Sequence, residues 1–315
     1  MKVIFMNGST ILNYNKSFTG GTEIMAKGFE ENILPLFPEF KNWNWILTPG
    51  EIKLREDGKN IVWVHLGEFE GDLSWLNDSR VAYIIFVSHY QYHRFLERYG
   101  LDSRKCFVIE NAINKIPVKR KPADKIKLIF QSEPYRGLEI LLQSLYNIKD
   151  DRIELHVFGD LDTDTVDFWK ESMQDKIKDL CLKDSRVVLH GRVEHRDLLE
   201  FIGSCHMFVY PSTWRETSCL SLIEAMSAGC YCITNDLTVL PETGMGFIDM
   251  YEFTFDEELH VKRLQKKIEY AIENLYKFDP TYQITLTNKK HSWENISNKW
   301  IKFGQELLES GNITK

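Results

Sequence analysis

Residues 210–235 read YPSTWRETSCLSLIEAMSAGCYCITN, and this stretch decides the fold. The apolar run Met207–Tyr210 predicts a buried strand, and the polar turn after it leads into a segment with helical spacing. We expect Ser218 to be the N-cap of that helix and Gly229 to follow its last turn in the left-handed conformation. A second apolar run, Tyr231–Thr234, follows at once. The order strand, turn, helix, strand is typical of a parallel α/β sheet.

The start of this helix is the predicted ligand-binding site. The turn lies at the carboxyl end of a parallel strand, where ligands bind in open α/β sheets. The first N–H groups of the helix, at Cys219, Leu220 and Ser221, lack acceptors within it and favour an anion. Two carboxylates, Glu216 and Glu224, flank this position. Because a carboxylate repels a phosphate, we expect both to accept hydrogen bonds from neutral hydroxyls, such as those of a sugar and a ribose. The alternative is a loop cap at Glu216 and a solvated side chain at Glu224.

The two glutamates, with seven residues between them, the ending EAMSAG and the preceding YPS resemble the donor-binding motif of the retaining glycosyltransferases of family 4, or group 1. The resemblance implies an α/β fold of GT-B architecture, in which two Rossmann-like domains with parallel sheets face a central cleft. The family has glycines and an aromatic residue after the first glutamate, whereas this chain has Thr217, Ser218 and Cys219. That departure affects the residues that the resemblance places in contact with the donor sugar.

The composition is that of a globular protein, with 43% hydrophobic residues and a formal net charge of −7. An acidic chain does not favour binding to nucleic acid. The six cysteines form no C-x-x-C pair, which favours reduced thiols in a cytoplasmic protein. The longest apolar run, Val81–Val87, is too short to span a bilayer, and the sequence predicts neither a signal peptide nor a transmembrane helix.

The length of 315 residues suits two domains. We predict a Rossmann-like acceptor-side domain over 1–118, a Rossmann-like donor domain over 119–290, and a last helix over 291–315 that crosses back to the first domain. Lys115–Lys127 reads KIPVKRKPADKIK, which is typical of a linker between domains. The alternative for this basic segment is a peripheral contact with an anionic membrane or acceptor.

Two sites in the first half match the family pattern. After the apolar run Val3–Met6, the glycines Gly20 and Gly21 open GGTE, which corresponds to the loop that faces the donor diphosphate and the acceptor. The apolar strand Ile61–Val64 delivers His65 at its carboxyl end. Related enzymes carry a histidine near the donor sugar at an equivalent place, so the resemblance implies a catalytic hydrogen bond from His65.

Two loops in the second half complete the predicted donor site. Arg136 lies between a predicted strand and a helix, where a guanidinium can hold two phosphate oxygens. It matches a family lysine, while the arginine that the family places earlier is absent, with Ser132 and Glu133 in that region. The loop with Arg192 and Val193 resembles the one that packs against the nucleotide base.

A metal site is not expected. Aspartates 160, 162 and 164 alternate after a strand and are superficially similar to the D-x-D of GT-A glycosyltransferases, but the α/β pattern is that of GT-B enzymes, which generally need no metal. His89 and His93 lie four residues apart with no further ligand nearby. We therefore predict no cofactor and no metal.

Taken together, the resemblance implies a retaining transferase of hexosyl type that moves a sugar from a nucleotide-diphosphate sugar to a carbohydrate, lipid-linked or other acceptor hydroxyl. Glu224 would bind the ribose, Glu216 the donor sugar, and Arg136 with the 219–221 amides the leaving diphosphate. Two alternatives remain: a GT-B epimerase or hydrolase of nucleotide sugars, and a catalytically idle scaffold that binds them. The sequence leaves the base, the sugar, the acceptor and the oligomeric state open.

Overall fold

The structure, a computed structural model, describes Leu12, Tyr14 and residues 20–48, 52–161 and 171–309. It consists of two compact units: unit 1 comprises residues 1–114 and 289–315, and unit 2 comprises residues 115–288. The predicted boundaries followed residues 118 and 290. The strand predicted at Val3–Met6 lies outside the described residues.

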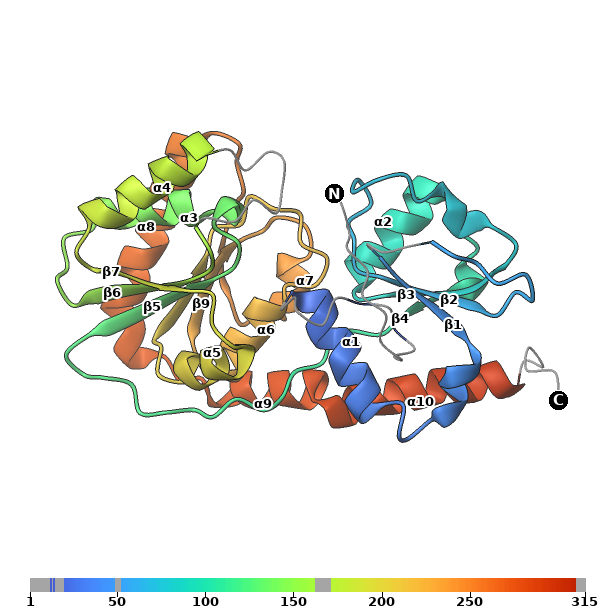
Figure 1. The fold of residues 1–315 in the computed structure, drawn as a ribbon. Helices are drawn as coiled ribbons and strands as arrows, with labels where there is room; N and C mark the ends of the chain where they lie inside the picture. The colour runs from blue at the N-terminus through green and yellow to red at the C-terminus, as the bar shows by residue number, and fades with distance from the viewer. Residues whose placement is uncertain (1–11, 13, 15–19, 49–51, 162–170, 310–315) are drawn as a thin grey trace. The chain divides into compact units, whose positions relative to one another are not determined.

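Unit 1 contains a four-stranded parallel sheet in the order β1-β2-β3-β4 (Figure 1). The central strand β2 reads NIVWV, and all five residues are buried, as expected where both faces of a parallel sheet are covered. The strands are β1 (Asn44–Thr48), β2 (Asn60–Val64), β3 (Val81–Phe86) and β4 (Cys106–Val108), and the helices are α1 (Gly21–Asn32), α2 (His89–Tyr99), α10 (Trp293–Glu309) and the 3-10 turns Pro38–Asn42, Ser74–Asn77 and Ser103–Lys105.

Helix α10 comes last in the chain and completes the core of unit 1. Its Trp300 ring is 1% exposed and lies 4.9 Å from the ring of Phe29 on α1 and 5.1 Å from the ring of Trp63 on β2. Lys299 on the same helix donates a hydrogen bond of 2.5 Å to Glu110. The core of this unit is thus built from both ends of the sequence.

Unit 2 contains a six-stranded sheet, all parallel, in the order β10-β9-β8-β5-β6-β7 (Figure 1). The chain runs outward from β5 through β6 to β7 and then returns to the other side of β5 as β8. The carboxyl ends of β5 and β8 therefore form a topological switch point, which is where open α/β sheets bind ligands. The strands are β5 (Ile126–Gln131), β6 (Ile153–Phe158), β7 (Val187–Gly191), β8 (Met207–Tyr210), β9 (Tyr231–Asn235) and β10 (Asp249–Tyr251).

The expected α/β fold with two parallel sheets is confirmed, and so is the predicted order of elements around residues 210–235, since β8, α6 and β9 follow one another. The helices of unit 2 are α3 (Leu138–Tyr146), α4 (Glu171–Lys183), α5 (His195–Ile202), α6 (Leu220–Ser227), α7 (Leu240–Gly244), α8 (Glu257–Asn274) and α9 (Thr281–His291), whose last residues belong to unit 1, with the 3-10 turns Pro134–Arg136 and Leu275–Lys277.

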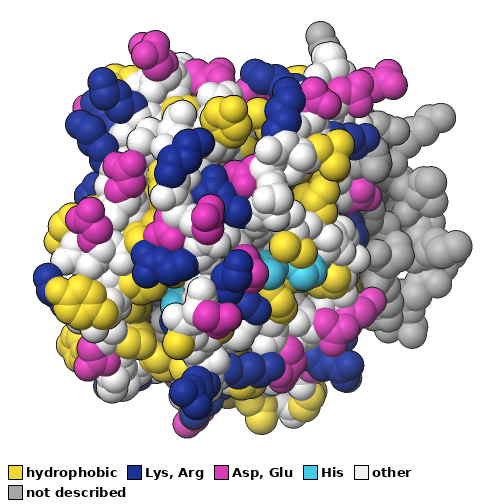
Figure 2. Space-filling model, turned by 90° about the vertical axis from the view of Figure 1, so that its left-hand side faces the viewer, with side chains coloured by type: hydrophobic (Ala, Val, Ile, Leu, Met, Phe, Trp, Pro, Cys, Tyr) yellow, Lys and Arg dark blue, Asp and Glu magenta, His cyan; other side chains and the backbone are white. Residues whose placement is uncertain are grey.

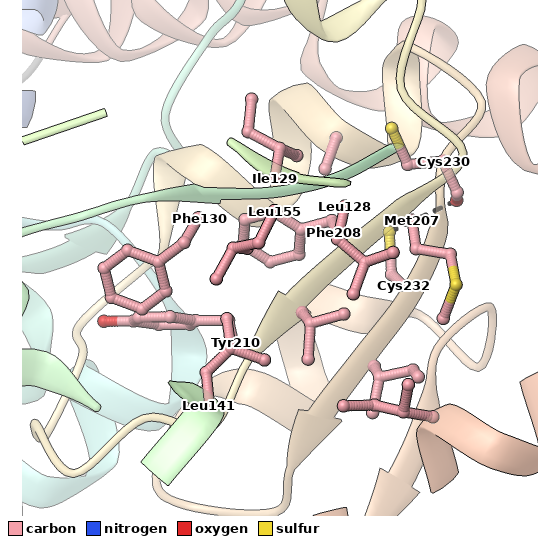
Figure 3. Packing of buried hydrophobic residues seen from close by; sticks show 14 of the residues in the cluster. Leu128, Ile129, Phe130, Leu141, Leu155, Met207, Phe208, Tyr210, Cys230 and Cys232 are labelled. Carbon is pink, nitrogen blue, oxygen red and sulfur yellow. Dashed lines mark hydrogen bonds between the residues drawn. The ribbon is translucent and has the colours of Figure 1, made fainter. Parts of the chain in front are cut away.

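The core of unit 2 lies on its central strands (Figure 3). Leu128 and Phe130 from β5 pack with Met207 and Phe208 from β8, and all four are at most 1% exposed. This rigid centre ends at the switch point, so the loops that leave β5 and β8 start from fixed positions.

Surface charge is mixed on the face of unit 2 that Figure 2 presents, where Lys and Arg alternate with Asp and Glu. Among the described helices, none combines the length and the apolar character that crossing a membrane requires.

Candidate functional site

Two loops at the switch point are tied together by their backbones. The N–H of Thr213 donates to the Arg136 carbonyl at 3.3 Å, and the Thr213 hydroxyl donates to the Tyr135 carbonyl at 3.1 Å. Gly137 has φ +121°, and a Cβ there would lie 2.2 Å from the Pro211 carbonyl oxygen. Only glycine allows this approach, which fixes Arg136 beside the loop that follows β8.

Arg136 and Glu216 form an ion pair across these loops. Arg136 Nη1 lies 3.0 Å from Glu216 Oε1, and the Tyr210 hydroxyl donates to the same oxygen at 2.6 Å. Burial, and then the charge of Glu216, raise the pKa of Tyr210 well above its ordinary value, so the phenol keeps its proton. The side chains of Arg136 and Glu216 are 26% and 13% exposed, so a ligand can reach both.

Aromatic rings surround the Arg136 guanidinium, whose carbon lies 5.1 Å from the centre of the Trp214 ring and 5.7 Å from that of Tyr135. Burial alone would lower the pKa of Arg136, but the carboxylate of Glu216 raises it above its ordinary value. A permanent cation is thus held in one orientation at the carboxyl ends of the strands, as binding of a phosphate requires.

Glu224 is buried on α6, 3% exposed, and both of its oxygens have protein partners. Oε1 lies 2.6 Å from His195 Nε2, and Oε2 accepts a hydrogen bond of 3.2 Å from Gln131 Nε2. Gln131 also donates to the Ser221 carbonyl at 3.2 Å. A solvated helix glutamate is therefore excluded, and the role of Glu224 toward a ribose remains a prediction.

His195 and Gln131 were not among the predicted site residues. Gln131 is the last residue of β5, and His195 is the first residue of α5, in the loop region after β7. The available signal was their position, since polar side chains at the carboxyl ends of parallel strands meet at one edge of the sheet.

The start of α6 differs from the prediction. Cys219, not Ser218, occupies the N-cap position, with φ 53° and no side-chain capping bond. The expected N-cap role of Ser218 is therefore wrong, and its carbonyl instead accepts a hydrogen bond of 2.7 Å from Thr243 on α7. Burial raises the pKa of the Cys219 thiol, and Leu220 begins the helix.

The end of α6 agrees with the prediction. Gly229 has φ +72°, its N–H donates to Met226, and the N–H of Cys230 donates to Ala225. These two bonds form a Schellman motif, which closes the helix and sends the chain into β9.

The predicted base loop follows β7. Arg192 Nη2 lies 3.3 Å from Glu133 Oε1, so the loops after β7 and β5 are joined by an ion pair. Val193 is partly buried against the core of unit 2. Glu133 stands in the region where an arginine was expected, so a carboxylate replaces a cation there.

His65, Gly20 and Gly21 belong to unit 1, whereas the other predicted site residues belong to unit 2. Burial lowers the pKa of His65 to about 3, so its ring is neutral at neutral pH. The backbone N–H of His65 donates to the Thr48 hydroxyl at 3.1 Å. Gly20 precedes α1 at its N-cap, and a Cβ on Gly21 would meet no atom within 4 Å. The participation of these three residues in donor chemistry stays a prediction.

No cluster of three or more His, Cys, Asp or Glu residues suited to a metal ion occurs in the described part of the chain. Asp162 and Asp164 lie outside it.

Comparison with known proteins agrees with the geometry. A family model described as "Glycosyl transferases group 1" matches residues 111–282, more than half of the chain. Over 130 residues, 40% of the chain, the sequence is 26% identical to a GDP-mannose:glycolipid 4-beta-D-mannosyltransferase of Xanthomonas campestris pv. campestris. Over 165 residues, 52% of the chain, it is 26% identical to the O-antigen chain mannosyltransferase RfbU of Salmonella typhimurium. The matches span 35% and 44% of the length of these two curated relatives.

Solved structures share the fold. A glycosyltransferase from Rickettsia africae superposes with a TM-score of 0.69 at 15% identity, covering 94% of this chain and 84% of that one. Anabaena HepE, solved in complex with UDP and glucose, superposes with a TM-score of 0.65 at 15% identity, covering 79% and 72%. The two-sheet GT-B architecture expected from the sequence is thereby confirmed.

Proposed function

The chain belongs to the group 1 glycosyl transferases, a family of enzymes, and from this premise we propose that it transfers a sugar, with retention of configuration, from a nucleotide-diphosphate sugar to an acceptor hydroxyl. The observation that carries the proposal is the joint placement of the Arg136–Glu216 pair, the buried Glu224 and the start of α6 at one switch point of unit 2. It brings together an arginine and helix amides for phosphates and two carboxylates for hydroxyls.

In this proposal Arg136 and the first amides of α6 bind the diphosphate, Glu224 the ribose and Glu216 the donor sugar. As the glycosidic bond breaks, positive charge develops on the sugar and negative charge on the departing diphosphate. Positive groups fixed beside that diphosphate stabilise the transition state more than the ground state. The acceptor attacks from the face that the diphosphate leaves, which retains the configuration. The hydrogen bond expected from His65 stays a prediction from the sequence.

Relatives support the substrate classes. Two carry names of mannosyltransferases, one of them using GDP-mannose and a glycolipid, and HepE has been solved with UDP and glucose. We therefore propose a nucleotide-sugar donor, a glycan or lipid-linked acceptor, and catalysis without a metal. All six cysteines are buried free thiols, which supports a cytoplasmic protein. We also propose that the basic segment Lys115–Lys127 makes a peripheral contact with an anionic membrane.

A thermal-shift panel tests the donor site. The purified chain is heated with UDP, GDP, ADP and their common sugar conjugates, with and without EDTA. A ligand that binds only the folded state raises the melting temperature. We expect a selective shift with one nucleotide that EDTA does not reduce. A shift without sugar transfer to any acceptor, but with release or epimerisation of the sugar, would favour the hydrolase or epimerase alternative. A shift with no turnover would favour an idle scaffold, and no shift at all contradicts the donor site.

A further inference from the structure

The two oxygens of the Glu216 carboxylate are not equivalent. Oε1 receives both the Arg136 guanidinium and the Tyr210 hydroxyl. No hydrogen bond joins Oε2 to any other residue in the described part of the chain. Because the side chain is 13% exposed, one oxygen is held by the protein while the other remains available to a ligand.

Tyr210 is rigidly placed. Its side chain is fully buried, and its ring centre lies 5.9 Å from those of Phe130 and Phe208. In Figure 3 the Tyr210 ring lies beside Phe130, with its hydroxyl oxygen directed away from Cys230 and Cys232. Ser132 donates to the Tyr210 oxygen at 3.4 Å, so the single phenolic proton is left for Glu216.

Another anion can displace the contact of Arg136 with Glu216 more readily than that of Tyr210. Its guanidinium carries five donors, of which Nη1 contacts the carboxylate. A diphosphate bound at the start of α6 would draw on the same cation, and the hold of Arg136 on Glu216 would then weaken. Among the described residues the Tyr210 hydroxyl donates to Glu216 alone, and burial keeps it protonated.

We propose that Tyr210 is a positioning residue, which fixes Oε1 of Glu216 so that Oε2 faces the hydroxyls of the donor sugar. This inference rests on the proposed function. Tyr210 itself touches neither the nucleotide nor the sugar, because its ring lies within the core of unit 2. Its effect should therefore appear only where the sugar is present.

The test compares Tyr210→Phe with wild type. The variant keeps the ring and removes only the hydroxyl. Titration calorimetry measures the affinity for UDP and UDP-glucose and for GDP and GDP-mannose, and kcat and KM are measured with whichever conjugate binds. We expect affinity for the sugar conjugate to fall by about tenfold, the typical loss for a hydrogen bond to a charged group, with affinity for the free nucleotide unchanged.

Tyr231→Phe is the matched control. Tyr231 on β9 donates to the Asp249 carboxylate at 3.1 Å in the same sheet, so this variant loses the same kind of hydrogen bond outside the switch point. It should change neither affinity. Glu216→Gln should reproduce the selective loss, and adding Tyr210→Phe to it should cost little more, because residues that act as a unit are not additive.

Several outcomes would overturn the inference. Equal weakening of nucleotide and conjugate by Tyr210→Phe would mean a purely structural role. If Glu216→Gln leaves the ratio of conjugate affinity to nucleotide affinity as in wild type, then Glu216 does not contact the sugar. This holds whatever the behaviour of Tyr210→Phe. Failure of wild type to bind any nucleotide or conjugate would instead overturn the proposed function.

Discussion

His195 Nε2 lies 2.6 Å from Glu224 Oε1, which joins the start of α5 to the middle of α6. Gln131 holds the other oxygen of the same carboxylate. Glu224 is therefore oriented by the last residue of β5 and the first residue of α5, and the direction of its remaining lone pairs is set before any ligand arrives.

His195→Ala should weaken nucleotide binding by about fivefold to twentyfold, because the freed carboxylate loses a strong hydrogen bond and its fixed orientation. Titration calorimetry with the nucleotide that stabilises the wild type measures the change. His89→Ala, at an exposed histidine on α2, serves as control. Unchanged nucleotide affinity in His195→Ala would mean that the orientation of Glu224 does not contribute to ribose binding.

Arg136→Ala and Glu224→Ala should each weaken donor binding by about tenfold or more, since each removes a charged group from the proposed contacts. Arg152→Ala is the matched control, because Arg152 makes a surface ion pair with Asp150 in the same unit. Melting curves establish that all three variants are folded. Wild-type nucleotide affinity in folded Arg136→Ala and Glu224→Ala would contradict both assignments.

Gly137→Ala should destabilise unit 2 by about 2–3 kcal/mol, because the new Cβ meets the Pro211 carbonyl and φ is positive. Gly246→Ala provides the comparison: its φ is +82°, but a Cβ there meets no atom within 4 Å. Urea unfolding measures both. Equal effects would show that backbone conformation, and not the close approach of the two loops, sets the cost.

Acid should destabilise the protein through His260. Burial, followed by the charge of Arg263, lowers the pKa of His260 to about 4, while the unfolded side chain titrates near 6.5. Between these values the unfolded state binds more protons, so stability falls as pH falls through this window and the loss is complete below pH 4. We expect a contribution on the order of 2 kcal/mol.

Urea unfolding at pH 7 and pH 5 measures this dependence. His260→Gln should reduce it, because glutamine does not titrate and can still form a hydrogen bond with the Tyr251 hydroxyl, which lies 2.8 Å from His260 Nε2. The exposed His89→Gln should leave it unchanged. An identical pH dependence in His260→Gln and wild type would assign the acid sensitivity to other groups.

Trp300→Ala should destabilise unit 1 by about 3–5 kcal/mol, the typical cost of truncating a buried tryptophan. Lys302→Ala, on the exposed side of the same helix, should have little effect. Hydrogen exchange of the β2 amides reports on unit 1 separately from unit 2. Protection of β2 that is unaffected by Trp300→Ala would mean that α10 does not stabilise this core.

Local patterns predicted the fold around residues 210–235 because the apolar runs and the Gly229 helix end depend on near neighbours in the sequence. Such patterns could not predict which residues bind the Glu224 carboxylate. His195 lies 29 residues from Glu224, and Gln131 lies 93 residues from it, so neither contact leaves a periodic signal. The N-cap prediction failed because Cys219 takes a left-handed conformation (φ 53°), which no apolar pattern indicates, so the helix begins one residue later than expected.

The position of α10 has a consequence for biosynthesis. Unit 2 is a continuous segment, so its core can assemble once residue 288 has left the ribosome. Unit 1 begins earlier but lacks Trp300 until α10 leaves the ribosome. Phe29 and Trp63 therefore lack this partner during translation until the whole of unit 2 has been made, and the core of unit 1 is completed only when α10 has emerged.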